Sequence, residues 1–357
     1  MSNISNKIKQ ISFSQKGVVF MKRGLRTAFV FIGLVIGAGF ASGREIMEYF
    51  NFPSSSDHSG VVLATFLLIC VCYVIMYKAY RHKIYTFDGY IGEIAGPFYV
   101  PVKIFMFLYL YCGFFTMLSG SGALLSQNFM VPSILGIVLM ALIAFGVLSF
   151  DLKGIVAANT VLVPCLIVGI IYICINSVIF NTQSVFSMGN LTRGTILSAI
   201  CYVSYNTVSA ASVLVPLSKD IRYNEIRIAA VTGGFVLGLL ILIIWTVQSM
   251  NFDKLWNSEI PMLKLAAMSG RTIKNITVAV LFMAISTTAV SQGFGILGYF
   301  RIASVKARVI ASAILCLSAI PFALIKFSHL VAYLYNFFGI AGLFWMGAVF
   351  YNYFFSS

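Results

Sequence analysis

The sequence contains very few charged residues for its length. Asp, Glu, Lys and Arg make up 10% of the 357 residues, and only ten residues are acidic. Soluble domains carry about 25% charged residues, which excludes a soluble globular protein. Histidine occurs three times without a partner at ligand spacing, and no Cys-x-x-Cys pair exists among the seven cysteines. These absences argue against a metal cluster, a disulfide framework and the nucleophile–base pair of an enzyme.

Apolar residues dominate instead. They account for 60% of the sequence, and the mean hydropathy is +0.96. Ten apolar runs reach or approach the ~20 residues that a helix needs to cross a bilayer. The sequence therefore predicts an all-α polytopic membrane protein with ten transmembrane helices in a lipid bilayer. Their expected ranges are 25–50, 60–79, 100–127, 133–150, 154–177, 194–217, 226–249, 271–300, 304–325 and 328–355.

Basic residues are distributed unequally between the two sides of these predicted spans. With the N-terminus inside, 17 Lys and Arg residues fall in the tail and the inner connections, and six fall in outer connections. Cytoplasmic loops carry the excess of Lys and Arg, so we expect both termini in the cytoplasm and residues 1–20 to form a basic cytoplasmic tail. The net charge of +14 then reflects topology, and no nucleic-acid partner is expected.

Two connections are longer than simple turns. Residues 85–100 have apolar residues at helical spacing, which predicts a helix along the inner surface. Residues 252–269 predict a short helical hairpin on the outer side. That hairpin is either an interfacial segment anchored by Trp256 or an external gate.

The stretch from Gly33 to Glu48 interrupts the first apolar run. Three glycines fall within seven residues (Gly37, Gly39 and Gly43), and each lowers helix propensity by roughly 1 kcal/mol relative to alanine. Two charged residues follow at once. Non-helical backbone at membrane depth is tolerated where it is buried in protein or lines a cavity. The stretch therefore predicts a discontinuous helix at a binding site, although the glycines are also compatible with close helix packing.

A second polar run, Ser204 to Ser212, lies in the sixth span and predicts a counterpart break near Tyr205–Ser209. The spans of the two halves correspond at an offset of roughly 170 residues. Since each half holds five spans, the repeat is expected to be inverted, with discontinuous helices 1 and 6. The predicted units are a first repeat over 21–178, an external connection over 179–192 and a second repeat over 193–355.

These residues carry a family resemblance. The stretch Thr27 to Phe50 resembles the opening span of the YkvI-type bacterial membrane proteins, of the amino acid–polyamine–organocation superfamily. Tyr205–Asn206 and the segment 259–263 are similar in a weaker way. The resemblance implies the 5+5 inverted-repeat fold of the leucine-transporter type, a superfamily of transporters and the cytoplasmic membrane of a bacterium. It supplies no substrate.

A break in a span exposes backbone N–H groups, which carry a partial positive charge, and backbone carbonyls, which carry a partial negative charge. Two of the spans are expected to have such a break. The half-helix beginning near Gly43 offers a positive N-terminal end to a carboxylate, and the one ending near Ile36 offers carbonyls to an ammonium group. A zwitterionic amino acid fits both ends. Gln292 is expected to contribute from the eighth span. The predicted substrate-binding residues are Gly37, Ala38, Gly39, Phe40, Ser42, Gly43, Phe114, Tyr205, Asn206, Thr207 and Ser209.

The sequence is compatible with either sodium or protons as the coupling ion. Arg44 and Glu48 are four residues apart and are expected to pair, which leaves Glu45 as a candidate proton carrier and Arg44 as a weaker coupling candidate. Ala284-x-x-Thr287-Thr288 resembles the sodium-site signature of sodium-coupled members of this fold, in which carbonyls of the first span complete the site. The residues implied for sodium are Gly33, Ile36, Ala284, Thr287 and Thr288.

Together these features predict a secondary transporter of a small zwitterionic solute, most simply an amino acid, with no cofactor beyond the coupling ion. The alternative is a non-transporting sensor that binds a small molecule in the same pocket. A channel is disfavoured because nothing resembles a selectivity filter or a ring of charges. The sequence does not predict the oligomeric state.

Overall fold

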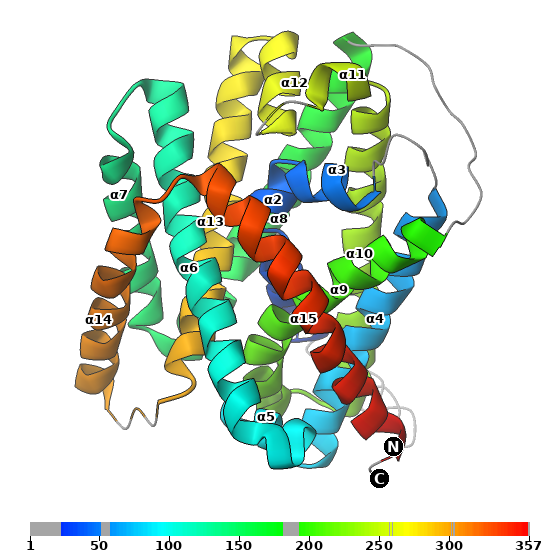
Figure 1. Ribbon diagram of the computed structural model, residues 1–357, viewed down its shortest axis with the longest axis vertical. Coiled ribbons are helices and arrows are strands. Elements are labelled where there is room, and N and C mark those ends of the chain that lie inside the picture. Colours follow the sequence, from blue (N-terminus) through cyan, green and yellow to red (C-terminus); the bar gives the residue numbers. More distant parts are fainter. Residues whose placement is uncertain are drawn as a thin grey trace, which may run out of the picture.

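The computed structural model describes residues 23–50, 58–180, 193–256, 258, 260–300, 302 and 304–355, and its secondary structure there consists of helices (Figure 1). This confirms the predicted all-helical class. The basic tail over 1–20 and most of the connection over 179–192 lie outside the described residues.

The long helices match the predicted spans, with ends that differ by no more than three residues. They are α4 (His58–Arg81), α6 (Tyr99–Phe129), α7 (Ser133–Leu148), α8 (Asp151–Phe180), α9 (Arg193–Leu217), α10 (Tyr223–Ser249), α13 (Arg271–Leu297), α14 (Val305–Ala323) and α15 (Phe327–Phe355). Eight helical segments of the described chain are long and apolar enough to cross a membrane. The 16-residue α7 is apolar but shorter. The count of ten spans and the division into two repeats stay predictions.

Helices α9 and α13 form the interior of the bundle. Burial of the most apolar 18-residue stretch differs between the spans. In the span that includes α9, 78% of that stretch is buried, against 67% for α13 and 22% for α14. Helix α9 packs against α4 and α15, and α13 packs against α6 and α8. The buried helices carry the hydroxyl and amide side chains, whereas α14 exposes Ile310, Ile314 and Leu317. Polar residues are thus concentrated where protein, and not lipid, surrounds them.

The first span is broken, as predicted. A helix over residues 23–35 ends before Ile36 and Gly37, which are not helical. A single turn, α2 (Ala38–Ala41), follows, and after Ser42 and Gly43 the chain continues as α3 (Arg44–Phe50). In Figure 1, α2 and α3 run across the bundle instead of along it.

The predicted break in the sixth span is wrong, because α9 is an uninterrupted helix over Arg193–Leu217. Its polar side chains donate hydrogen bonds to carbonyls three or four residues earlier in the same helix. Examples are Asn206 to the Tyr202 carbonyl oxygen (2.9 Å) and Thr207 to the Val203 carbonyl oxygen (2.8 Å). Such bonds leave the backbone ladder intact. The segment also lacks the glycines that break the first span, so helix 6 is continuous.

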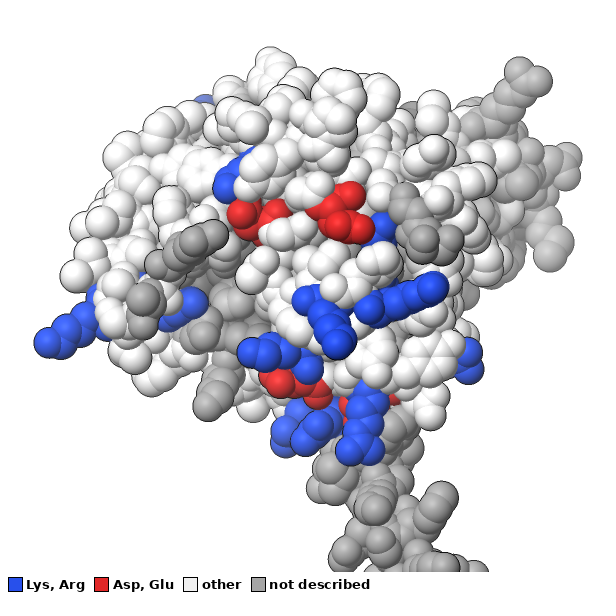
Figure 2. Space-filling model, turned by 90° about the horizontal axis from the view of Figure 1, so that it is seen from below, with Lys and Arg blue, Asp and Glu red and all other residues white. Residues whose placement is uncertain are grey.

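The two ends of the bundle differ. At one end lies α5 (Phe87–Ala95), a helix as predicted, followed by the short 3₁₀ turn η1 (Gly96–Phe98). At the other end the predicted hairpin is present as α11 (Phe252–Leu255) and α12 (Pro261–Ser269). The α5 end also holds η2 (Ser218–Asp220) and the last turn of α15, where the Asn352 amide donates to the Ile94 carbonyl oxygen at 3.1 Å. Figure 2 shows this end, with more basic than acidic side chains on it.

Candidate functional site

The break in the first span has a defined backbone geometry. Gly37 is extended (φ −94°, ψ −169°), and Gly43 has φ +76°, a left-handed conformation that glycine adopts without strain. Between them, Gly39 approaches the Glu45 side chain so closely that a Cβ at Gly39 would lie 2.1 Å from Glu45 Oε1. Glycine is therefore required at position 39 by contact and at position 43 by conformation.

A small cavity lies against this break. Its volume is about 10 Å³, enough for roughly one water molecule. Four elements line it: the broken first span, α6, α9 and α13. The lining residues are Leu34, Val35, Gly37, Glu45, Met117, Tyr205, Asn206, Ser209, Thr288 and Gln292. A larger solute requires these helices to move apart, which is the motion of alternating access in transporters.

Helix α9 contributes the polar wall of the cavity. Tyr109 of α6 donates a 2.6 Å hydrogen bond to the Tyr205 carbonyl oxygen, and its hydroxyl also lies 3.3 Å from Ser209 Oγ. The Tyr109 and Tyr205 rings are 5.7 Å apart in an edge-to-face arrangement. Tyr109 therefore fixes the position of this wall.

Glu45 is the charged residue of the cavity lining. It is 4% exposed and belongs to the first turn of α3. The neighbouring Arg44 lies on the other side of α3, where its guanidinium donates to the carbonyl oxygens of Trp256 (3.5 Å) and Ser258 (3.4 Å) and lies 3.8 Å from Glu48. The Arg44–Glu48 pair that the spacing predicted is present, and Arg44 does not line the cavity.

The residues implied for sodium lie between the break and α13. Thr288 donates to the Ile36 carbonyl oxygen at 3.3 Å, and Thr287 donates to the Ala284 carbonyl oxygen at 2.9 Å. The Thr288 hydroxyl is thus brought to a carbonyl that the break releases from the helical ladder, whereas the Thr287 hydroxyl bonds within α13. Oxygen ligands of this kind suit a hard cation. In the described chain no group of three or more His, Cys, Asp and Glu residues is placed to hold a metal ion.

Asn159 of α8 is a neighbour of this region that the sequence analysis missed. It is fully buried; its amide nitrogen donates to the Ile155 carbonyl oxygen, while its Oδ1 accepts no hydrogen bond from the described residues. A Cβ at Gly33 would lie 1.9 Å from that oxygen. An isolated asparagine in an apolar span gives no sequence signal of such a contact.

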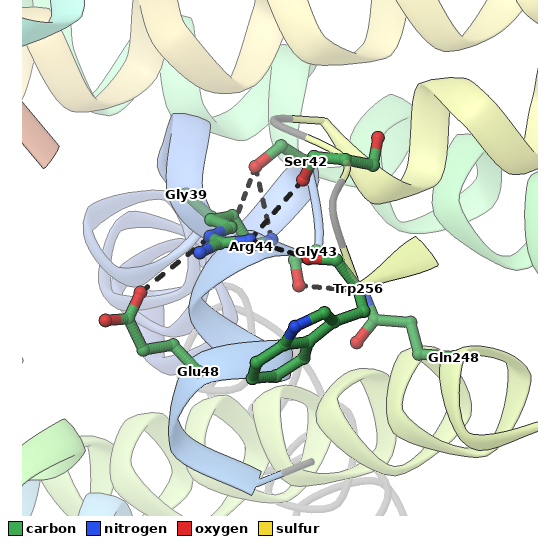
Figure 3. A network of polar contacts seen from close by, with 8 residues as sticks. Gly39, Ser42, Gly43, Arg44, Glu48, Gln248 and Trp256 are labelled. Atoms are coloured by element: carbon green, nitrogen blue, oxygen red, sulfur yellow. Dashed lines mark hydrogen bonds and ion pairs between the residues drawn. The ribbon is translucent and has the colours of Figure 1, made fainter. Parts of the chain in front are cut away.

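The α3 side of the site is closed by contacts with α10 and the α11–α12 hairpin (Figure 3). Gln248 of α10 donates to the Gly43 carbonyl oxygen at 2.7 Å, and the Met262 backbone N–H donates to the Ser42 carbonyl oxygen at 2.9 Å. With the two bonds from Arg44, the hairpin is fastened to both sides of the Ser42–Gly43 turn. The sequence analysis did not find Gln248, which looks like an ordinary polar residue near a helix end.

A larger cavity of about 950 Å³ opens at the α5 end. Its rim is polar, and its wall includes Val156 and Thr160, which flank Asn159 in α8. In the described residues the larger cavity therefore opens at the α5 end, whereas the one at the hairpin end, between the ends of α6 and α14 and the start of α7, has about 340 Å³.

The remaining predicted site residues lie near the cavity without lining it. Phe114 is buried against α13, 3.3 Å from the position of a Cβ at Gly293. Thr207 bonds within α9 and faces away from the lining. The residues of the break that do not line the cavity are Ala38, Gly39, Phe40, Ser42 and Gly43. Conversely, Leu34, Val35 and Met117 line it although the sequence did not single them out.

Comparison with known proteins places this geometry among transporter folds. No family model matches the chain. Two uncharacterized proteins of Bacillus subtilis (strain 168) are similar: YyaD, 26% identical over 325 residues (90% of this chain and 95% of YyaD), and the membrane protein YkvI, 27% identical over 330 residues (90% and 94%).

Solved structures with a similar fold include a Na⁺-coupled sialic acid symporter (TM-score 0.67, 14% identity, 93% of this chain and 78% of that chain). A second is Mhp1, a nucleobase-cation-symport-1 family transporter (TM-score 0.57, 15% identity, 93% and 78%). A third is the manganese transporter of Eremococcus coleocola (TM-score 0.56, 13% identity, 93% and 77%). These likenesses establish the fold.

Proposed function

We propose that this protein is a secondary active transporter of a small solute with a protonated amino group, in the first place an amino acid. The observation that carries the proposal is the cavity at the broken first span, where buried Glu45 faces polar residues of α9 and α13. Transporters with discontinuous helices hold their substrates at such breaks. The functions of the structural neighbours, symport and transport, support the same class.

The asymmetry of the two ends supports alternating access. The Arg44 guanidinium and the Met262 N–H fasten the hairpin to the break, and Gln248 fastens α10 to it, while a cavity of about 950 Å³ occupies the other end. This arrangement is that of a transporter closed on the hairpin side. Because basic residues gather at the α5 end (Figure 2), that end belongs to the cytoplasm in the proposed topology. The membrane is then the cytoplasmic membrane of a bacterium, with both termini inside.

Two coupling ions stay open. The Thr288–Ile36 contact supports sodium, since hydroxyl and carbonyl oxygens are the ligands that it would take, with Gly33, Ala284 and Thr287 completing the set. Burial of Glu45 supports protons, because a carboxyl group at membrane depth is a natural carrier. Both ions would act at the same break.

Uptake by the purified full-length protein in proteoliposomes tests the proposal. We expect accumulation of at least one labelled amino acid or amine when an inward sodium or proton gradient is imposed, and none in liposomes without protein. Binding without flux under either gradient would contradict transport and leave the sensor function. Neither binding nor flux would contradict the assignment of the site.

A further inference from the structure

The cavity lining contains an acidic side chain and no basic one. Among its ten described lining residues, Glu45 is charged and none is Lys, Arg or His. Arg44, which precedes Glu45 in the sequence, is basic, but its side chain is directed to the hairpin and is 38% exposed. A substrate that enters this cavity therefore meets a carboxylate and no positively charged side chain. In a site removed from water, the sign of the charge on the lining side chain decides whether the ammonium end or the carboxylate end of a zwitterion binds there more tightly.

The place expected for a substrate carboxylate is taken by the protein itself. The sequence predicted that half-helices at the break would present their N-terminal ends to such a group. However, α2 has four residues and α3 has seven, too short to develop much of a macrodipole. The Glu45 side chain also packs directly against Gly39 of α2 and lies in the first turn of α3. The protein's own carboxyl group thus lies at the break, where the sequence predicted the carboxylate of a substrate.

The other polar atoms of the lining favour a hydrogen-bond donor. Gln292 is 2% exposed, and its Oε1 accepts no hydrogen bond from the described residues. The Tyr205 ring lies on the same lining, and aromatic faces attract ammonium groups. A protonated amine brings three donors to these acceptors, whereas a carboxylate brings only acceptors.

From this arrangement we infer that the site recognises a protonated amino group and does not require a carboxylate, so that primary amines bind as well as amino acids. The inference rests on the proposed function and narrows its substrate class. Glu45 holds the ammonium group and Gln292 accepts a second hydrogen bond from it. Carboxylic acids without an amino group are rejected by the charge of Glu45.

A set of three matched ligands tests the inference. Leucine, 3-methylbutylamine and 4-methylpentanoate share one apolar side chain and differ only in the charged groups; the alanine and phenylalanine sets extend the comparison. Binding to the solubilised full-length protein is measured by the shift of its thermal midpoint, and flux by charge movement in proteoliposomes. We expect the amine of at least one set to bind as tightly as its amino acid or more tightly, and the acid not to bind.

Two variants test whether Glu45 and Gln292 recognise the amino group. Glu45→Gln should weaken amine binding about 10- to 100-fold, as expected for loss of a charge-assisted hydrogen bond. Gln292→Met should weaken it about 10-fold. Glu48→Gln, on the exposed face of the same helix, is the matched control and should bind like the parent. If Glu45→Gln does not fold, binding of the three matched ligands to the parent protein and to Gln292→Met still tests the inference.

The outcomes separate the inference from the function on which it rests. Binding of the amino acid with no binding of its amine would overturn the inference and leave the transporter intact. Binding of the acid, or amine binding that is as tight in Glu45→Gln as in the parent, would also overturn it. No binding and no current for any member of the sets would overturn the proposed function, and the inference with it.

Discussion

Gln248 donates a 2.7 Å hydrogen bond to the carbonyl oxygen of Gly43, although 205 residues separate them in the chain. The bond joins α10 to the turn between α2 and α3, and the Met262 N–H bonds the adjacent Ser42 carbonyl oxygen. The Gly43 carbonyl oxygen also accepts the Met47 backbone N–H of α3 at 3.0 Å, so Gln248 adds a second bond there, whereas the Met262 N–H supplies a partner for the Ser42 carbonyl oxygen in the turn. The contacts at this end are therefore made by the same break that lines the small cavity.

Gln248→Met should shift the protein toward a conformation open on the hairpin side. Loss of one buried hydrogen bond costs about 1–1.5 kcal/mol, a shift of about 5- to 12-fold in the population of the open form. The measurement is the rate at which a membrane-impermeant thiol reagent modifies Asn206→Cys in a background without the seven native cysteines. Thr246→Val is the control, since the Thr246 hydroxyl bonds only to its own helix, at Leu242. An unchanged rate in the Gln248 variant would show that the bond does not hold the closed form.

Gly39→Leu should weaken ligand binding without preventing membrane insertion. A Cβ at this position would already lie 2.1 Å from Glu45 Oε1, so a larger side chain must displace the carboxylate. Overpacking costs about 1–3 kcal/mol, which corresponds to about a 5- to 150-fold increase in Kd. Gly347→Leu is the control, because a Cβ there would have no neighbour within 4 Å. Unchanged affinity in the Gly39 variant would place the binding site elsewhere.

The first break was predictable from the sequence and the continuity of α9 was not, for one physical reason. Glycines weaken a helix wherever they stand, so Gly37 and Gly43 signal a break without knowledge of their surroundings. Hydroxyl and amide side chains can either bond back to carbonyls of their own helix or compete with the backbone hydrogen bonds and interrupt it. Those of Asn206 and Thr207 bond back to their own helix, and that choice depends on the tightly packed interior around α9. Tyr205, Asn206 and Ser209 line the cavity although α9 is continuous, and their role in substrate binding stays a prediction.

Contacts between distant segments were the least predictable part of the site. The contacts of Gln248 with Gly43 and of Asn159 with Gly33 join residues more than 100 positions apart. Neither residue has a motif around it. Gln292 was recognised because the eighth span was already expected to line the site. The sequence thus reveals which spans form the cavity, while packing determines which of their polar residues reach it.

The orientation in the membrane is tested by residues at the two ends of the bundle. Lys83 follows α4 at the α5 end, and Met130, which is 95% exposed, follows α6 at the hairpin end. In cells, a cysteine at position 130 should react with an impermeant thiol reagent from outside, and a cysteine at position 83 only after permeabilisation. The background again lacks the native cysteines. Reversed labelling would overturn the orientation that the positive-inside rule predicts.

The coupling ion is decided by two substitutions that predict opposite results. Thr288→Val keeps the shape of the side chain but removes the hydroxyl that contacts the Ile36 carbonyl oxygen at 3.3 Å. If sodium drives uptake, this variant should need about 10-fold more sodium for half-maximal uptake, since an oxygen ligand is worth about as much as a hydrogen bond to a charge. Thr277→Val is the matched control on the same helix, because the Thr277 hydroxyl bonds only to the Ile273 carbonyl oxygen.

If protons drive uptake, Glu45→Gln should remove the response to a pH gradient, because the amide cannot take up and release the proton that a buried carboxyl group carries. Exchange of substrate across the membrane should persist in this variant at raised substrate concentration, which separates coupling from recognition. Both variants and the Thr277 control are compared in one proteoliposome assay, with each ion gradient imposed in turn. Loss of the sodium response in Thr288→Val alone identifies sodium, and loss of the pH response in Glu45→Gln alone identifies protons. If uptake in both variants matches the parent under both gradients, ion coupling through the break is wrong, because these are the residues there that would bind either ion.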